Sequence, residues 1–241
     1  MRIVAIIQAR MGSTRLPGKV MLDLAGEPML IRVVNRVRRA VTVDEVVVAT
    51  SSDPANDRIA SLCQDHKVSC FRGSEDDVLD RYHRAALEFN AEAVVRVTSD
   101  CPLVDPGIID RIVGEFIAAH PGVDYISNTM QRSFPRGLDV EVFSMEALVE
   151  AELSERDPRL REHVTMPIYC HPDKFVCVNI KNDADLSGMR WTVDTIEDYE
   201  LVRRIYDYFG NDAFDCKQVV TLLSDNPEWL ELNRHIQQKA I

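Results

Sequence analysis

The stretch MRIVAIIQARMGSTRLPGK, residues 1–19, decides the fold of this chain. Its apolar run Ile3–Ile7 has the length and the β-branched content of a buried central strand. The run stops at Gln8, and the loop that follows combines glycines, small hydroxyls and cations: Arg10, Gly12, Ser13, Thr14, Arg15, Gly18 and Lys19. Open α/β sheets bind ligands at the carboxyl ends of their strands, and such a loop suits a polyphosphate. A plain strand-to-helix loop with solvated charges is the alternative.

The spacing of this loop excludes a P-loop. A P-loop has four residues between its first Gly and its Gly-Lys pair, and Ser or Thr follows the Lys. Here five residues, STRLP, separate Gly12 from Gly18, and Val20 follows Lys19. Pro17 also removes one amide donor. The chain is therefore not a P-loop NTPase, and side chains would hold the phosphates as much as backbone amides.

The composition limits the classes of protein to which this chain can belong. The chain has 241 residues, 46% hydrophobic content and a net charge of −11, which suits a globular enzyme and argues against nucleic-acid binding. No apolar run is long enough to span a bilayer, and the first run is not a signal peptide, so we expect a cytoplasmic protein without membrane partners. The six cysteines have neither CxxC nor zinc-ligand spacing, which favours free thiols.

Positive charge is concentrated near the start of this acidic chain. Residues 1–40 hold eight Arg or Lys and two acidic residues. This balance suits a site for a small anion whose charge a metal also helps to neutralise. Three of the arginines, Arg32, Arg36 and Arg39, fall in a helix expected to begin near Pro28. We expect these three side chains on the solvated face of that helix.

The string IIQARMGSTRLPGKVMLDLAGEPML, residues 6–30, resembles the opening of the cytidylyltransferases that activate sugar acids, such as the CMP-Kdo and CMP-sialic acid synthetases. Among their relatives it most resembles the group called spore-coat polysaccharide biosynthesis protein F. The resemblance implies a single domain over residues 1–241 with a three-layer α/β nucleotide-diphospho-sugar transferase (glycosyltransferase-A-like) fold and a mostly parallel sheet. An irregular β-rich insertion at about 123–181 would complete the sugar site, and it is a candidate interface for a homodimer.

Two later strands are expected to end near the first loop. The second strand ends in residues 50–53, Thr-Ser-Ser-Asp, whose hydroxyls, with Ser51 as the candidate, could read the nucleotide base or could cap the next helix. The third strand ends at Arg72, another candidate nucleotide-binding residue. Ser74 then caps a helix that carries Arg81. The resemblance assigns nucleotide binding to an arginine of this helix, and we carry this role over to Arg81.

Two aspartates are candidate metal ligands. A fourth strand ends just before Asp100, where an acidic residue faces the same crevice as the first loop or merely ends the strand. By resemblance, Asp100 stands in an Asp-x-Pro-Leu motif whose Asp binds the catalytic magnesium. Asp194 closes an expected last strand over residues 189–194, and by resemblance it is the second magnesium ligand. Thr195 and Asp198 form a near capping box, which leaves Asp194 free to face the crevice.

The middle of the chain is expected to supply the sugar site. GLDVEVFS, residues 137–144, is predicted as a strand with Asp139 and Glu141 on one face, where they contact the sugar or are solvated. Arg132 and Arg136 lie just upstream and could bind an acid substrate bidentately.

The resemblance adds one histidine to the sugar site. His163 and Tyr169 match the spacing of a His-x-x-x-x-x-Tyr segment whose histidine lines that site. A single histidine is more often structural. The identity of the sugar stays open because this middle segment matches least.

We therefore predict a magnesium-dependent cytidylyltransferase that transfers CMP from CTP to a sugar acid and releases pyrophosphate for surface-polysaccharide synthesis. Five residues of the first loop would hold the triphosphate: Arg10, Ser13, Thr14, Arg15 and Lys19. The predicted catalytic residues, with Mg²⁺ on the two aspartates, are Arg10, Lys19, Asp100 and Asp194. The alternatives are a glycosyltransferase of the same fold, although Asp100 lacks an Asp-x-Asp partner, and a nucleotide-binding protein without catalysis. A nucleotide other than CTP also stays open.

Overall fold

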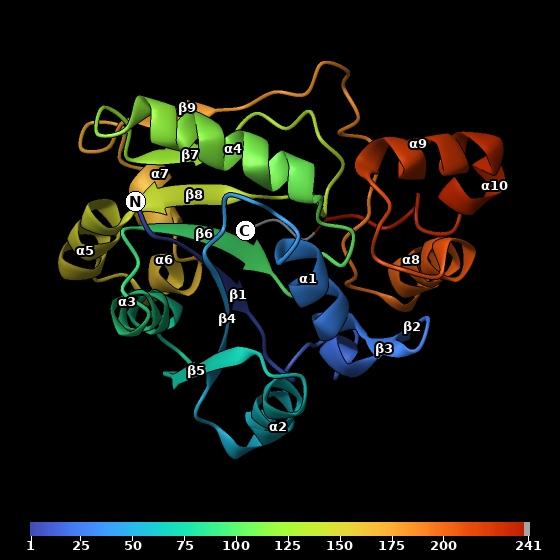
Figure 1. The fold of residues 1–241 in the computed structure, drawn as a ribbon, viewed down its shortest axis with the longest axis horizontal. Helices are drawn as coiled ribbons and strands as arrows, with labels where there is room; N and C mark the ends of the chain where they lie inside the picture. Colours follow the sequence, from blue (N-terminus) through green and yellow to red (C-terminus); the bar gives the residue numbers. More distant parts are fainter. Residues whose placement is uncertain (239–241) are drawn as a thin grey trace.

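The computed structural model describes residues 1–238, and the predicted single domain, residues 1–241, extends three residues beyond this part. The main sheet has seven strands: β1 Ile3–Gln8, β4 Glu45–Ser51, β5 Ser69–Gly73, β6 Ala93–Thr98, β7 Tyr125–Ser127, β8 Glu141–Ser144 and β9 Cys177–Asn179. Their order is β5–β4–β1–β6–β8–β7–β9, which Figure 1 shows from bottom to top. β8 is antiparallel to both neighbours and the other pairs are parallel, so the prediction of a mostly parallel sheet is confirmed.

Helices cover both faces of this sheet. They are η1 Lys19–Met21, α1 Met29–Val37, η2 Pro54–Asn56, α2 Asp57–Asp65, α3 Val78–Glu88, α4 Pro106–Ala119, α5 Met145–Ser154, α6 Pro158–Glu162, α7 Met166–Tyr169, α8 Ile196–Phe209, α9 Cys216–Asp225 and α10 Pro227–Leu230. A small separate hairpin joins β2 Asp23–Leu24 to β3 Glu27–Pro28. None of the described helices is long and apolar enough to cross a membrane.

The first strand separates two hydrophobic cores. Ile3, Ala5 and Ile7 belong to the core that α1, α2, α4, α8 and α9 cover, whereas Val4 and Ile6 belong to the core under α3, α5 and α7. Successive side chains of a strand point to opposite faces, so a strand with both faces covered is apolar throughout. This is why the run at the start of the chain is continuous rather than alternating, and the predicted three-layer α/β fold is confirmed.

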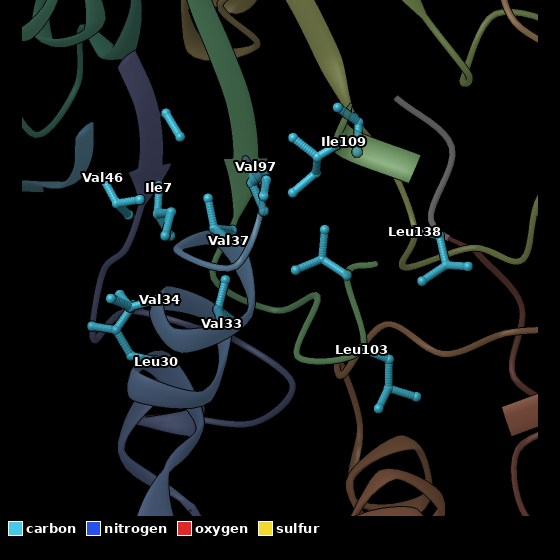
Figure 2. Packing of buried hydrophobic residues seen from close by; sticks show 14 of the residues in the cluster. Ile7, Leu30, Val33, Val34, Val37, Val46, Val97, Leu103, Ile109 and Leu138 are labelled. Carbon is cyan, nitrogen blue, oxygen red and sulfur yellow. The ribbon is translucent and has the colours of Figure 1, made fainter. Parts of the chain in front are cut away.

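The larger core explains how α1 is attached to the sheet. Figure 2 shows Val33, Val34 and Val37 of α1 on the face of the sheet that carries Ile7 and Val97. All five side chains are at most 1% exposed. Burial of each such side chain contributes about 1.5–3 kcal/mol to stability, so α1 fixes the end of β1 firmly.

The prediction that Arg32 and Arg36 lie on the solvated face of their helix is wrong. Arg36 is 0% exposed and Arg32 is 6% exposed, whereas Arg39 lies just beyond the end of α1 and is on the surface. Arg36 donates to the carbonyl oxygen of Val104 (2.7 Å), and Arg32 pairs with Asp212 (3.0 Å). Their long side chains reach backbone carbonyls and a carboxylate of other segments, so they join α1 to the loops around it.

The predicted last strand over residues 189–194 is wrong. The described structure has only an isolated bridge there, between Arg136 and Arg190. The segment crosses the end of the sheet instead of pairing along a strand, and the N–H of Val193 donates to the carbonyl oxygen of Asp100 (2.8 Å). Backbone groups of this segment are therefore satisfied by loops, which leaves its side chains near the strand ends.

The segment at 123–181 is mixed rather than β-rich. It holds three short strands, β7, β8 and β9, and three helices, α5, α6 and α7. The predicted strand over 137–144 is shorter in the structure, where β8 begins at Glu141. Before that point the side chain of Asn128 takes the place of a ladder partner: its Nδ2 donates to Leu138 O (2.7 Å) and its Oδ1 accepts from Val140 N (3.0 Å).

Replacement of Gly137 is predicted to destabilise the fold strongly. Gly137 has φ +105°, and a Cβ there would lie 2.5 Å from the backbone nitrogen of Thr192. We expect Gly137→Ala to lower the free energy of unfolding by more than about 2 kcal/mol, measured by urea denaturation. Gly114→Ala in α4 is the matched control, because a Cβ there meets no atom within 4 Å and alanine favours the helix. Equal effects of the two changes would contradict this prediction.

Candidate functional site

A cavity of about 340 Å³ lies at the carboxyl ends of β1 and β6. Its wall is built by the loop after β1, the end of β6, α3, the end of α6 and the residue before α8. Nine predicted site residues line it: Arg10, Ser13, Thr14, Arg15, Lys19, Arg81, Asp100, His163 and Asp194. The cavity therefore occupies the place where open α/β sheets bind ligands.

The first loop is a closed turn that presents its polar side chains to the cavity. The backbone N–H groups of Ser13 and Gly18 both donate to Met11 O (3.1 and 3.0 Å), and Met11 N donates to Asn56 Oδ1 (2.8 Å). Gly18 has φ +69°, a conformation that favours glycine, and it lets the chain turn directly into η1. Lys19 then points back into the molecule.

The ammonium of Lys19 joins the two predicted metal ligands. Its Nζ lies 3.0 Å from Asp100 Oδ2 and 2.9 Å from Asp194 Oδ1, and it also donates to Val193 O (2.7 Å). Lys19 is only 9% exposed. Burial lowers the pKa of Lys19, but the two carboxylates outweigh burial and raise the pKa above its ordinary value. The group therefore stays charged between two anionic partners.

Asp194 is held by three cations. Besides Lys19, the guanidinium groups of Arg15 and Arg190 each approach its Oδ2 at 3.0 Å. Burial alone would raise the pKa of Asp194, but Lys19, Arg15 and Arg190 lower it below its ordinary value. Asp194 is therefore an ionised carboxylate that keeps its orientation.

Local hydrogen bonds orient both aspartates. Thr98 Oγ1 donates to Asp100 Oδ1 (2.6 Å) at the end of β6. The predicted capping box at the start of α8 is confirmed: Thr195 Oγ1 accepts from Asp198 N (3.4 Å), and Asp198 Oδ2 accepts from the N–H groups of Thr195 (3.1 Å) and Asp194 (3.0 Å). Asp198 therefore caps the helix, and the carboxylate of Asp194 points elsewhere.

Two further arginines lie at the wall. Arg10 is half-exposed, and its guanidinium lies 3.9 Å from Glu162. Arg81 is 3% exposed, donates to the carbonyl oxygen of Ser74, and has a buried Nε without a hydrogen-bond partner among residues 1–238. Burial lowers the pKa of Arg81. A buried N–H at a cavity wall is suited to an oxygen atom of a ligand.

Ser51 and Arg72 do not line this cavity, so the structure does not support their predicted contacts with the nucleotide. Ser51 is 1% exposed, and its Oγ accepts from Asn56 Nδ2 (2.8 Å) and from Asp53 N (3.1 Å). Arg72 pairs with Asp57 (2.7 Å) and donates to Ser51 O (3.0 Å). These side chains hold the turn before α2, and their contacts with a nucleotide stay a prediction.

The predicted sugar residues are also mostly elsewhere, since Arg136, Asp139 and Glu141 do not line the cavity. Asp139 receives two hydrogen bonds from Arg132, so both of these side chains are engaged with each other. Glu141 is 7% exposed and faces neighbouring side chains rather than solvent. The two carboxylates do not share one strand face because Asp139 lies before β8 begins, whereas Glu141 belongs to β8 and pairs with Arg96 of β6. His163 does line the cavity, and burial lowers its pKa.

The structure adds cavity residues that the sequence reasoning missed. Gln8, Arg96, Thr98 and Glu162 belong to the wall. The signal for Arg96 was available, because a charged residue interrupts the otherwise apolar strand AVVRVT. No comparable signal marked Glu162, which only tertiary packing brings beside Arg10.

Comparison with known sequences identifies relatives over the whole length. A family model for cytidylyltransferases matches residues 4–240. The chain is 35% identical over 242 residues to an uncharacterized protein of Methanocaldococcus jannaschii, covering 100% of this chain and 98% of the relative. It is 32% identical over 234 residues to the spore coat polysaccharide biosynthesis protein SpsF of Bacillus subtilis, covering 94% and 95%. A 3-deoxy-manno-octulosonate cytidylyltransferase of Geobacter sulfurreducens is 40% identical over 125 residues, covering 51% and 48%.

Solved structures agree with these relatives. A cytidylyltransferase from Leptospira borgpetersenii matches with a TM-score of 0.93 and 33% identity over 100% of both chains. The structure of CMP:2-keto-3-deoxy-manno-octonic acid synthetase complexed with CTP has the same fold, with a TM-score of 0.67 and 20% identity over 86% of this chain and 99% of that one. The resemblance of the first loop to this family is confirmed. The chain therefore belongs to the cytidylyltransferase family and is a nucleotidyltransferase.

Proposed function

We propose that this protein is a magnesium-dependent cytidylyltransferase that transfers CMP from CTP to a sugar acid, releases pyrophosphate, and serves surface-polysaccharide synthesis. The observation that carries the proposal is the convergence of Asp100 and Asp194 on Lys19 Nζ, at 3.0 and 2.9 Å, in a cavity walled by the cationic first loop. The names of the relatives support the substrate class, since they include a polysaccharide biosynthesis protein and octulosonate cytidylyltransferases.

The two carboxylates fit a magnesium ion. Asp100 Oδ2 and Asp194 Oδ1 approach the same atom, Lys19 Nζ, so they face one point. The ammonium occupies that point here, and the ion would take its place when Lys19 turns to the phosphates. Mg²⁺ prefers oxygen ligands and commonly takes one or two carboxylates together with substrate phosphates and water. Within residues 1–238 no group of three or more His, Cys, Asp or Glu could hold a metal by itself, so the nucleotide would complete the coordination. When bound, the ion supplies positive charge to the α-phosphoryl group.

The first loop would bind and orient the triphosphate. Arg10 and Arg15 keep 54% and 36% of their side chains exposed, so their guanidinium groups are accessible to a ligand. With Lys19 and the hydroxyls of Ser13 and Thr14 they would hold the β- and γ-phosphates. The sugar hydroxyl oxygen then bonds to the α-phosphorus in line and gives up its proton to solvent, while the bond from that phosphorus to the oxygen shared with the β-phosphate breaks and pyrophosphate leaves. The loop cations stabilise the charge on the leaving pyrophosphate, and no protein nucleophile is required.

The products separate this proposal from the two alternatives. A glycosyltransferase of the same fold would consume a nucleotide sugar and release no pyrophosphate. A nucleotide-binding protein without catalysis would bind CTP and leave it intact. Pyrophosphate release is therefore the decisive measurement.

Purified protein is predicted to release pyrophosphate from CTP plus a sugar acid. We would supply ATP, GTP, UTP or CTP with a panel of 2-keto sugar acids of eight and nine carbons and measure pyrophosphate by a coupled assay. We expect turnover with CTP, its loss on chelation with EDTA, and its return on addition of Mg²⁺. Turnover that persists in EDTA would contradict the metal, and absence of pyrophosphate with every sugar acid would contradict the proposed function.

Replacement of Asp194 is predicted to remove turnover without unfolding the protein. Asp194→Asn keeps the shape of the side chain but loses the charge that faces Lys19 and Arg15, so we expect kcat to fall by at least about 100-fold. Asp173→Asn, at an exposed position outside the cavity wall, is the control and should keep wild-type kcat. Circular dichroism should give the same folded spectrum for both variants. Near-normal turnover of Asp194→Asn would refute its assignment as a ligand.

Truncation of Arg15 is predicted to weaken nucleotide binding. Arg15→Met removes a charge-assisted contact worth roughly 1.5–3 kcal/mol, so the KM for CTP should rise by about tenfold or more. Arg58→Met, at an exposed position outside the cavity wall, should leave this KM unchanged. If Arg15→Met binds CTP normally in a calorimetric titration, the first loop is not the phosphate site.

A further inference from the structure

Arg96 is a charged residue in the middle of a sheet. It belongs to β6, at the centre of the order of strands, and its side chain is 13% exposed. In register it stands opposite Glu141 of β8, and the two side chains form an ion pair. Its guanidinium also belongs to the cavity wall. A buried cation is costly unless it is paired, so its place at the cavity requires an explanation.

The ion pair is fixed from behind. Glu141 Oε1 accepts from Arg96 Nη1, and Glu141 Oε2 accepts from the hydroxyls of Tyr125 (2.9 Å) and Thr165. Both oxygens of Glu141 are therefore engaged. Glu141 and its two hydroxyl donors hold the guanidinium in one orientation. Burial lowers the pKa of Arg96, but Glu141 outweighs burial and raises the pKa above its ordinary value, so Arg96 stays protonated.

Part of the guanidinium is left for a ligand. Arg96 Nε and Nη2 both donate to Gln8 Oε1 (3.3 and 3.1 Å), and Nη1 donates to Glu141. A guanidinium has five N–H groups, so these contacts leave one on each of Nη1 and Nη2. A guanidinium that keeps unused N–H groups at a cavity wall can donate them to a carboxylate of a ligand.

The other cations of the cavity wall have proposed roles toward the nucleotide or its aspartates. Lys19 and Arg15 contact the aspartates that face the nucleotide phosphates in the proposed reaction, and Arg10 lies beside Glu162. Arg132, the candidate from sequence for an acid substrate, is bound to Asp139 and does not line the cavity. A sugar acid adds a negative charge to those of the nucleotide, and Arg96, unlike Arg10, Arg15, Lys19 and Arg81, is a wall cation with no proposed role in nucleotide binding.

We propose that Arg96 binds the carboxylate of the acceptor sugar acid and that Glu141 is the residue that positions it. This inference rests on the proposed function, because it assumes a sugar-acid acceptor. It identifies the acceptor part of the cavity with Gln8, Arg96 and His163. It also gives the buried ion pair a role in specificity: the enzyme discriminates acids from neutral sugars of the same shape.

The test compares an acid with its neutral form in matched variants. With the sugar acid that wild type uses and its methyl ester, we would measure KM and kcat for Arg96→Gln, Arg96→Lys and Glu141→Gln. We expect Arg96→Gln to raise the KM for the acid by at least about tenfold, to leave the KM for CTP within about twofold, and to abolish the preference for acid over ester. Arg96→Lys should recover part of the preference, and Glu141→Gln should weaken it.

Two control variants distinguish binding from structure. Arg32→Gln removes another buried arginine–carboxylate pair, outside the cavity, so it should lower the unfolding midpoint and leave the acid preference intact. Arg132→Gln tests the competing candidate. If Arg96→Gln behaves like Arg32→Gln, or if Arg132→Gln alone removes the acid preference, the assignment of Arg96 is overturned.

The remaining outcomes are also decisive. If Arg96→Gln does not fold, the double variant Arg96→Met with Glu141→Met replaces the ion pair by apolar groups, and retention of the acid preference by that variant would overturn the assignment. If wild type uses no sugar acid at all, the proposed function fails and this inference fails with it. If wild type uses a sugar acid and the preference survives in Arg96→Gln, only this inference fails.

Discussion

The structure depends on the contact of one ammonium with two carboxylates. Lys19, Asp100 and Asp194 come from three distant parts of the chain, and each would lose much of its solvation free energy if it were buried alone. Together, their opposite charges compensate for the lost solvation. Arg15 and Arg190 also pair with Asp194, through its second carboxylate oxygen. The start of η1, the end of β6 and the start of α8 are therefore tied to a single point, and the cavity forms around that point.

The position of this cluster follows from the layers. Both faces of the sheet are covered by helices, so strands such as β1 are apolar on both sides, and polar side chains can gather only where strands end. Arg96 is a charged residue inside the central strand β6. It is tolerated because its partner Glu141 lies opposite in the neighbouring strand, and because hydroxyls of Tyr125 and Thr165 complete that carboxylate. Arg96 lies at the edge of the cavity, where a polar group can meet a ligand.

Arginines serve two different purposes in this chain. Arg32 and Arg36 point into the protein and bind carbonyl oxygens of other segments, so they fasten α1 to its surroundings. Arg10 and Arg15 stay partly exposed at the cavity, where a ligand can reach them. The local sequence does not separate the two uses, because all four arginines stand in sequence patterns that are typical of surface residues. The separation comes from which carbonyls and carboxylates the fold brings within reach.

The sequence by itself determined the elements whose cause is local. The apolar run of β1, the spacing that excludes a P-loop, and the capping box that frees Asp194 all depend on residues a few positions apart. The two aspartates were found through short motifs. Only the tertiary structure decided which distant side chains meet: Lys19 with Asp100 and Asp194, Arg32 with Asp212, and Glu141 with Arg96. These pairs depend on strand register and on segments far apart in the chain, and a shift of one residue would turn every side chain of a strand to the opposite face.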